Sequence, residues 1–374
     1  MGQTGGGMEE SFSAFTLLAG RAILFSMHPP LESYNREILG ATDANHAMEA
    51  WPALKALGRF LELPFGRGRL FYFDSHPDDR RRRVVFLVHG LGDEGDSFRH
   101  LFPLLSGTFR VIAADLPGFG RSVAKGAVTV RLCVEALAAL LDAEVDGAAL
   151  VAGSSLGASM AQLLALRDPE RVGALLLEDG GSPSPGKPPS SLLSMALPLV
   201  GKRRYEGFKG RDDAAVRSLY PYYADWAGLP GPDREFLSKR VVARVNSPSQ
   251  ERAYISLLRS AMFTTVLKSG AFSRQLDSWN KPLTVVWGAG DRVVPAESGR
   301  AIADRVKGGR FDLVEGAGHL PHQERPAAVA ATIEELAARI DANFAARVAS
   351  APSKASIRNV AVESESVGPA RSGK

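Results

Sequence analysis

The sequence is poor in cysteine, and Cys133 is the only one among its 374 residues. A single cysteine excludes a disulfide within the chain and any zinc site built from several thiolates. Because Cys133 stands in an apolar stretch with helical spacing, residues 130–134, we expect a buried structural side chain rather than a reactive thiol. The function must therefore come from other residue types.

Long uncharged apolar runs are also lacking. The most apolar early segment, residues 11–27, is preceded by Glu9 and Glu10 and interrupted by Arg21. Neither a signal peptide nor a membrane-spanning helix has this pattern. We therefore expect no stable membrane insertion, and we take the cytoplasm as the default location.

Neither sign of charge is in large excess. The 45 Lys and Arg residues against 41 Asp and Glu residues give a formal net charge of +4, so nucleic acid is not an expected partner. The basic cluster Arg80–Arg83 precedes an apolar run, and we interpret it as a solvated strand entry rather than an anion site. The sequence has no glycine-rich phosphate loop and no histidine pair at metal-ligand spacing, so we expect neither a cofactor nor a metal.

What is present is a series of short apolar runs separated by turn residues and helix-length segments. Seven of them read as strands: 70–73, 84–88, 111–114, 148–152, 174–177, 283–287 and 310–314. Most are continuously apolar, which is typical of parallel strands that helices cover on both faces. Helix-like stretches such as 129–142 and 157–167 alternate with them. The pattern predicts an α/β fold with a doubly wound, mostly parallel sheet.

An inserted domain interrupts this alternation. About a hundred residues without a comparable strand follow residue 177, which is too long for an ordinary loop. They carry several helix-like segments and open with a Pro- and Gly-rich stretch, 180–189, so we predict a helical cap on a flexible linker that lets it act as a lid. Five parts result: an N-terminal extension, partly helical or disordered (1–58), a first core segment (59–180), the cap (181–277), a second core segment (278–347) and a disordered tail (348–374).

Ser155 is the candidate nucleophile. It stands in Gly153-Ser154-Ser155-Leu156-Gly157, directly after the apolar run 148–152 and before a helix-like segment. Strand, sharp turn and helix are the context of a Gly-x-Ser-x-Gly nucleophile elbow, in which glycines let backbone segments pass closely. Ser154 is a neighbouring competitor, but only Ser155 has a glycine two positions before it and two positions after it.

With this elbow, three further segments resemble the α/β-hydrolase superfamily, specifically its members with a helical cap, over about residues 68–345. His89-Gly90-Leu91-Gly92 resembles the family's oxyanion loop. Residues 115–122, Asp-Leu-Pro-Gly-Phe-Gly-Arg-Ser, resemble its Asp-x-Pro-Gly-x-Gly-x-Ser turn, and residues 316–319, Gly-Ala-Gly-His, resemble its histidine loop. The resemblance implies serine chemistry with the backbone N–H groups of Leu91 and Leu156 as the oxyanion hole.

The same resemblance implies a base and an acid. His319 is the candidate general base, because a serine hydroxyl needs a base and this fold uses the order nucleophile, acid, histidine. His322, three residues further on, is its rival. Asp291, in a loop that resembles the family's acid loop, is the favoured orienting acid. Asp179 stays an alternative, because some relatives place their acid after the earlier strand that precedes it.

These features predict a serine hydrolase, carboxylesterase-like, that cleaves an ester or similar acyl bond of a small molecule without a cofactor. Four aromatics in the cap, Tyr220, Tyr222, Tyr223 and Trp226, predict an apolar or aromatic pocket wall, although their spacing also suits the cap's own core. Two other functions stay open: a carbon–carbon bond hydrolase of the same fold, and a ligand receptor that keeps the pocket without turnover. The sequence specifies neither the substrate nor the oligomeric state.

Overall fold

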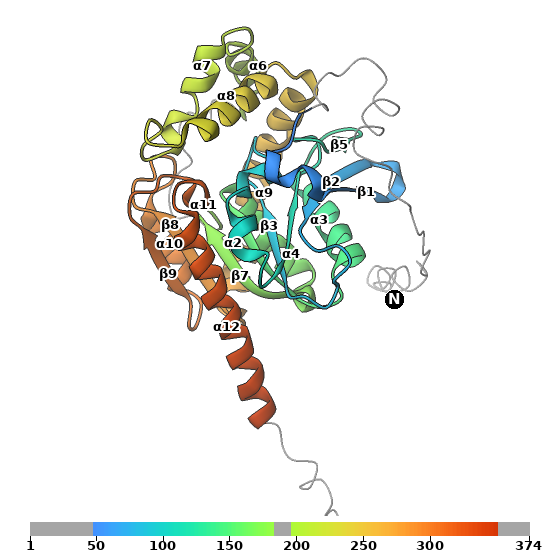
Figure 1. The fold of residues 1–374 in the computed structure, drawn as a ribbon, viewed down its shortest axis with the longest axis vertical. Helices are drawn as coiled ribbons and strands as arrows, with labels where there is room; N and C mark the ends of the chain where they lie inside the picture. The colour runs from blue at the N-terminus through green and yellow to red at the C-terminus, as the bar shows by residue number, and fades with distance from the viewer. Residues whose placement is uncertain (1–47, 183–195, 351–374) are drawn as a thin grey trace, which may run out of the picture. The chain divides into compact units, whose positions relative to one another are not determined.

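A computed structural model describes residues 48–182 and 196–350 of the chain. Within these residues a nine-stranded sheet has the order β1-β2-β4-β3-β6-β7-β8-β9, with β5 beside β2 (Figure 1). Every pair from β4 to β9 is parallel, whereas β2 is antiparallel to its neighbours β1, β4 and β5. All five residues of β3 are buried, and since successive side chains point to opposite faces, helices must cover both faces. The predicted fold class is confirmed.

All seven predicted strands are present, and two more were not predicted. The strands are β1 (Gly58–Glu62), β2 (Gly68–Asp74), β3 (Val84–Val88), β4 (Arg110–Ala114), β5 (Val123–Ala124), β6 (Ala149–Ser154), β7 (Val172–Glu178), β8 (Leu283–Gly288) and β9 (Arg310–Val314). β1 is a half-buried edge strand and β5 has only two residues, so neither has the continuous apolar run that marks a central strand.

The helices predicted over 129–142 and 157–167 are present as α3 (Val130–Glu144) and α4 (Leu156–Arg167). The core also contains α2 (Leu101–Leu105), α10 (Ala296–Ala303), α11 (Pro321–Glu324) and α12 (Pro326–Ser350). The Thr129 side chain caps α3 by accepting a hydrogen bond from the N–H of Leu132. Cys133 on α3 is fully buried, as expected, and burial raises the pKa of its thiol. No helix in the described ranges is long and apolar enough to cross a membrane.

Three predictions concern the ends and the linker of the chain. The predicted tail begins at residue 348, but α12 continues to Ser350. The rest of the tail, residues 1–47 of the N-terminal extension and most of the linker 180–189 lie outside the described residues. The described end of the extension forms a 3-10 helix, Pro52–Leu57, that contacts β2.

Within its described residues, the insertion between β7 and β8 consists of helices joined by turns and contains no strand. It contains α6 (Pro198–Glu206), α7 (Asp212–Arg217), the 3-10 turn η7 (Tyr220–Tyr222), α8 (Gly231–Val245) and α9 (Pro248–Ser278). A small apolar cluster of its own includes Tyr205, Ala215 and Val241. α9 contacts α6 and α8 of the cap as well as α3 and α4 of the core, so this one helix belongs to both.

Buried ion pairs tie α8 to the core. Nε of Arg240 lies 2.7 Å from Oε1 of Glu94, and its Nη2 lies 2.9 Å from Oδ2 of Asp96. Asp233, near the start of α8, pairs with Arg99 at 2.5 Å. All five side chains belong to residues that are at most 4% exposed. Separating such pairs would leave buried charges without partners. The contacts therefore favour a fixed cap over a swinging lid.

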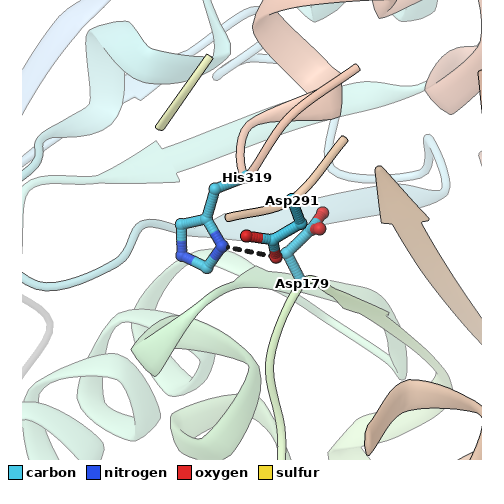
Figure 2. Close-up of side chains that lie close together, drawn as sticks. All are labelled: Asp179, Asp291 and His319. Atoms are coloured by element: carbon cyan, nitrogen blue, oxygen red, sulfur yellow. Dashed lines mark hydrogen bonds and ion pairs between the residues drawn. The ribbon is translucent and has the colours of Figure 1, made fainter. Parts of the chain in front are cut away.

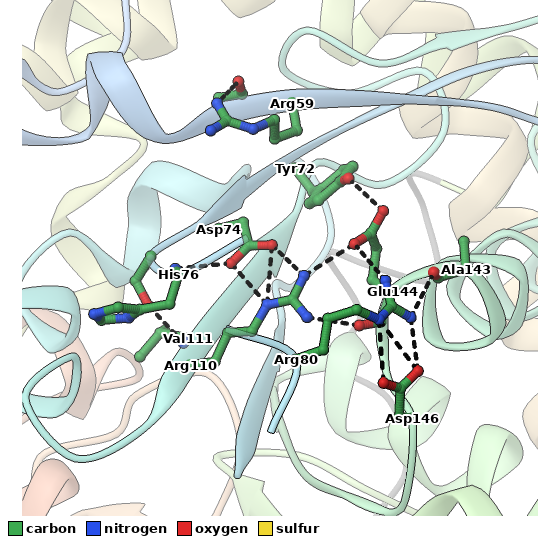
Figure 3. Close-up of polar contacts among 12 residues, drawn as sticks. Arg59, Tyr72, Asp74, His76, Arg80, Arg110, Val111, Ala143, Glu144 and Asp146 are labelled. Carbon is green, nitrogen blue, oxygen red and sulfur yellow. Dashed lines mark hydrogen bonds and ion pairs between the residues drawn. The ribbon is translucent and has the colours of Figure 1, made fainter. Parts of the chain in front are cut away.

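Arginines of the basic cluster that precedes β3 form ion pairs within the chain, and Figure 3 shows those of Arg80. Arg80 donates hydrogen bonds to Asp146 and lies 3.7 Å from Glu144. Glu144 also accepts from Arg110, whose side chain is fully buried together with Asp74 at 2.5 Å. Two further arginines of the cluster pair in the same way, namely Arg82 with Asp79 and Arg83 with Asp341. The arrangement agrees with a strand entry held by ion pairs.

Candidate active site

Ser155 occupies the sharp turn between β6 and α4. Its backbone angles, φ 54° and ψ −120°, lie in a region that residues with a side chain rarely adopt. Two glycines make the turn possible. A Cβ atom on Gly153 would lie 2.3 Å from the carbonyl oxygen of Gly157, and one on Gly157 would lie 2.2 Å from that of Val88. No side chain fits at either position, which explains the Gly-x-Ser-x-Gly pattern physically.

Three side chains from separate loops form one chain of hydrogen bonds. Nε2 of His319 lies 2.9 Å from Oγ of Ser155, and Nδ1 lies 2.8 Å from Oδ2 of Asp291. The other oxygen of Asp291 accepts hydrogen bonds from the N–H groups of Val293 and Val294, which fixes the carboxylate. An imidazole held in this way has Nδ1–H toward the acid and leaves Nε2 to accept the serine proton.

The rival acid, Asp179, lies beside Asp291, but its carboxylate points away from His319 (Figure 2). Its Oδ1 accepts a hydrogen bond from the N–H of Gly288 at 3.0 Å. Burial raises the pKa of Asp179 well above its usual range, and the charges of Glu178 and Asp291 add to this effect. Burial acts on Asp291 in the same direction, but the hydrogen bond and charge of His319 outweigh it and lower the pKa of Asp291. These opposite directions make Asp291 the more readily ionised of the two acids.

The two other competitors lie away from the chain of hydrogen bonds. Ser154 is buried at the end of β6, and no described residue bonds its Oγ. His322 is fully buried, with Nδ1 2.9 Å from Oε1 of Glu178 and Nε2 2.8 Å from Oγ of Ser97. A second serine, histidine and acid chain therefore lies next to the first.

The direction of hydrogen bonding shows that Ser97 is no second nucleophile. Its Oγ lies 2.6 Å from Oδ2 of Asp93, 2.7 Å from Nε2 of Gln323 and 2.8 Å from Nε2 of His322. A hydroxyl has one proton and two acceptor sites. Asp93 takes the proton and the Gln323 amide fills one acceptor site, so the imidazole must donate to the other. His322 then cannot act as a base toward Ser97.

The two predicted oxyanion donors lie in segments that adjoin Ser155. Leu156 is the first residue of α4, and Leu91 follows Gly90 in the loop after β3. A Cβ atom on Gly90 would lie 3.1 Å from Cβ and 3.6 Å from Oγ of Ser155, so this loop passes directly over the serine. Buried His89 shapes the loop, with Nδ1 2.8 Å from the carbonyl oxygen of Gly90. The oxyanion role of both N–H groups stays a prediction.

A cavity of about 280 Å³ lies over Ser155 and His319, between the core and the cap. Among the predicted pocket residues, Tyr222 and Tyr223 line it. Tyr220 and Trp226 are not part of the lining: Tyr220 is 42% exposed, and Trp226 packs against the rings of Tyr220 and Tyr223. Proximity in sequence alone therefore did not reveal which of these aromatics line the cavity.

Several lining residues were missed by the sequence analysis. They include Leu237, Arg244 and Tyr254. Tyr222 also holds the histidine loop, because its carbonyl oxygen accepts a hydrogen bond from the N–H of His319 at 2.8 Å. The three missed residues lie on α8 or α9. Apolar and charged residues on a helix carry no local signal for which of them will face a cavity.

Most of the chain matches a known protein family. The profile of the Alpha/beta hydrolase family matches residues 84–332, which span the sheet from β3 onward, the cap and part of α12.

The chain belongs to the α/β hydrolase family.

Two curated relatives of the hydrolase illustrate its range. The pimeloyl-[acyl-carrier protein] methyl ester esterase of Neisseria meningitidis serogroup A is 28% identical over 268 residues, which cover 70% of this chain and 78% of that protein. A 2-hydroxy-6-oxononadienedioate/2-hydroxy-6-oxononatrienedioate hydrolase of Dechloromonas aromatica is 24% identical over 245 residues, or 63% of this chain and 80% of that protein. One name describes ester cleavage and the other a different hydrolysis.

Solved structures share the fold of the hydrolase. A thermophilic esterase from Thermogutta terrifontis superposes with a TM-score of 0.60 at 21% identity and covers 76% of this chain and 98% of its own. A 2-hydroxy-6-oxo-6-phenylhexa-2,4-dienoate hydrolase from Rhodococcus gives 0.61 at 22% identity, with 75% and 99% covered. At these identities the likeness concerns the fold alone.

Proposed function

We propose that the hydrolase is a cofactor-free serine hydrolase that cleaves an ester or similar acyl bond of a small molecule. Ser155 is the nucleophile, His319 the general base and Asp291 the acid that orients the base. The observation that carries the proposal is the continuous chain of hydrogen bonds from Asp291 through His319 to Ser155, at a cavity large enough for a small substrate. The name of the Neisseria relative supports an ester as the substrate.

The reaction follows from these positions. Nε2 of His319 takes the proton of Ser155 as Oγ attacks the carbonyl carbon, and the oxyanion that forms accepts hydrogen bonds from the N–H groups of Leu91 and Leu156. His319 then gives its proton to the departing alkoxide, which leaves as an alcohol. Water attacks the acyl-serine with His319 again as base, and the carboxylic acid is released while Ser155 regains its proton. Asp291 stabilises the imidazolium in both steps.

Carbon–carbon bond hydrolysis is the second candidate. The name of the Dechloromonas relative favours it, and the same serine, histidine and aspartate could serve it. The Neisseria relative is more similar and matches more of the chain, so we rank ester cleavage first. Turnover of simple alkyl esters, measured beside turnover of a vinylogous 1,5-diketone, decides between the two.

Labelling with a fluorophosphonate probe tests the nucleophile. The probe should bind covalently to Ser155, and Ser155→Ala should lose both labelling and ester turnover, the latter by about 10⁴-fold or more. Ser154→Ala is the matched control and should label normally. A folded wild-type protein that resists the probe would reject the proposal and favour a ligand receptor that lacks turnover.

A further inference from the structure

Arg244 is a feature of the cavity wall that the proposed reaction does not use. It lies in the last turn of α8 and lines the same cavity as Ser155 and His319. Its Nε is buried and no described residue accepts a hydrogen bond from it. Arg240, one turn earlier on the same helix, pairs with Glu94 and a second carboxylate. Among the described residues no carboxylate forms such an ion pair with Arg244.

The guanidinium group lies beside the loop that passes over the nucleophile. A Cβ atom on Gly92 would lie 3.7 Å from Nη1 of Arg244, and one on Gly90 would lie 3.6 Å from Oγ of Ser155. Because adjacent Cα atoms are 3.8 Å apart, these two glycines are separated by at most about 8 Å. Because both residues line the same cavity of about 280 Å³, a small molecule bound there can contact Ser155 and Arg244 at the same time.

The surroundings of Arg244 suit an anion. Its planar fork of N–H donors matches the two oxygens of a carboxylate, and a partly desolvated guanidinium gains most from such a partner. Asp93 is the single acidic residue of the lining. Asp93 is already engaged, because one of its oxygens accepts the proton of Ser97.

We propose that Arg244 binds a carboxylate of the substrate, so that the hydrolase prefers half-esters of dicarboxylic acids to neutral esters. The carboxylate would lie at the α8 side of the cavity while the scissile carbonyl lies at Ser155. The preference rests on the proposed function, because it names the substrate class of the same site.

The test compares two substrates that differ in charge. For wild type, Arg244→Met and Arg244→Lys, kcat/KM is determined from initial rates on monoethyl adipate and on diethyl adipate. We expect Arg244→Met to lose about 10- to 100-fold on the half-ester and less than about threefold on the diester, the range expected for one charge-assisted contact. Arg244→Lys should fall between, since it keeps the charge and loses the fork. Arg252→Met, an exposed site on α9 outside this cavity, controls for net charge.

Equal losses on both esters, or no loss on either, overturn the inference, and an equal loss assigns Arg244 to structural support of α8. Fluorophosphonate labelling separates this failure from that of the proposed function. If wild type labels at Ser155 while Arg244→Met leaves the ratio of the two esters unchanged, only the carboxylate site is wrong. If wild type does not label, calorimetric binding of adipate to both proteins still decides, because the site predicts at least a tenfold loss of affinity in Arg244→Met.

Discussion

Oδ1 of Asp179 accepts a hydrogen bond from the backbone N–H of Gly288, the last residue of β8, at 3.0 Å. The loop that follows Gly288 carries Asp291. Asp179 therefore supports the strand end from which the orienting acid projects, while the hydrogen bond to the imidazole comes from Asp291 itself. This relationship gives the two acids separate and testable roles.

The first prediction separates the acids by activity. Asp291→Asn should lower ester turnover by up to about 10⁴-fold, because an amide at this position favours the wrong tautomer of His319. Asp179→Asn should keep most of the activity, since its amide oxygen can still accept from Gly288 and its amide nitrogen can donate to Asp291. Steady-state kinetics on one ester compares both variants. Loss of turnover in Asp179→Asn alone would reverse the assignment.

The second prediction concerns the pH dependence of stability. Because the pKa of Asp179 is raised on folding, the wild type loses stability as the pH rises from the unfolded pKa of aspartate toward the raised folded value. Asp179→Asn has no proton to lose there. Its free energy of unfolding relative to wild type should therefore increase with pH across that window, measured as urea midpoints at pH 4 and pH 8. If the difference in free energy of unfolding between the two proteins does not change with pH, the pKa of Asp179 is not raised on folding.

A third prediction concerns the cavity wall. Tyr223 lines the cavity, and its hydroxyl donates a hydrogen bond to Gln323. Tyr223→Ala should reduce kcat/KM for bulky aromatic esters more than for acetate esters. The difference should correspond to about 1 to 3 kcal/mol of transition-state stabilisation. Tyr223→Phe keeps the ring and should keep the selectivity. Trp226→Ala, outside the lining, should affect both kinds of ester alike. Parallel losses for both kinds of ester in Tyr223→Ala would assign this ring to the cap's own core.

The fourth prediction concerns the second histidine. Glu178 is almost fully buried, and both its oxygens lie within 3.0 Å of Nδ1 of His322. His322→Ala should lower the free energy of unfolding by about 1 to 3 kcal/mol, because the buried carboxylate loses the imidazole and keeps only the backbone N–H of residue 322 as a donor. Adding Glu178→Gln removes the stranded charge, so the double variant should recover part of the loss. Chemical denaturation of the three variants measures this coupling, and additive losses would argue against it.

Sequence alone predicted those parts of the molecule that backbone chemistry constrains strongly. The central buried strands, such as β3, β4 and β8, required nearly continuous apolar runs. The turn at Ser155 required glycine on both sides because no Cβ atom fits there. β1 was not predicted, because this half-buried edge strand has no such apolar run.

The two acids could not be separated in advance, for a topological reason. β7 and β8 are adjacent and parallel, so their carboxyl ends meet at the same edge of the sheet. Asp179 and Asp291 therefore both reach the neighbourhood of His319, and only side-chain direction distinguishes them. Likewise, which residues of α8 face the cavity depends on how this helix packs on the core, and Arg244 has no local pattern that reveals it.

The ion pairs between α8 and the core also bear on how a substrate reaches Ser155. Lifting α8 would expose Arg240 and Asp233 together with their core partners, so the cap should rarely detach while the sheet stays folded. Amide protons of α8 should then exchange with deuterium nearly as slowly as those of the central strands. Entry would depend on brief side-chain rearrangements around the cavity mouth, which makes bulky substrates slow to associate even where they bind well.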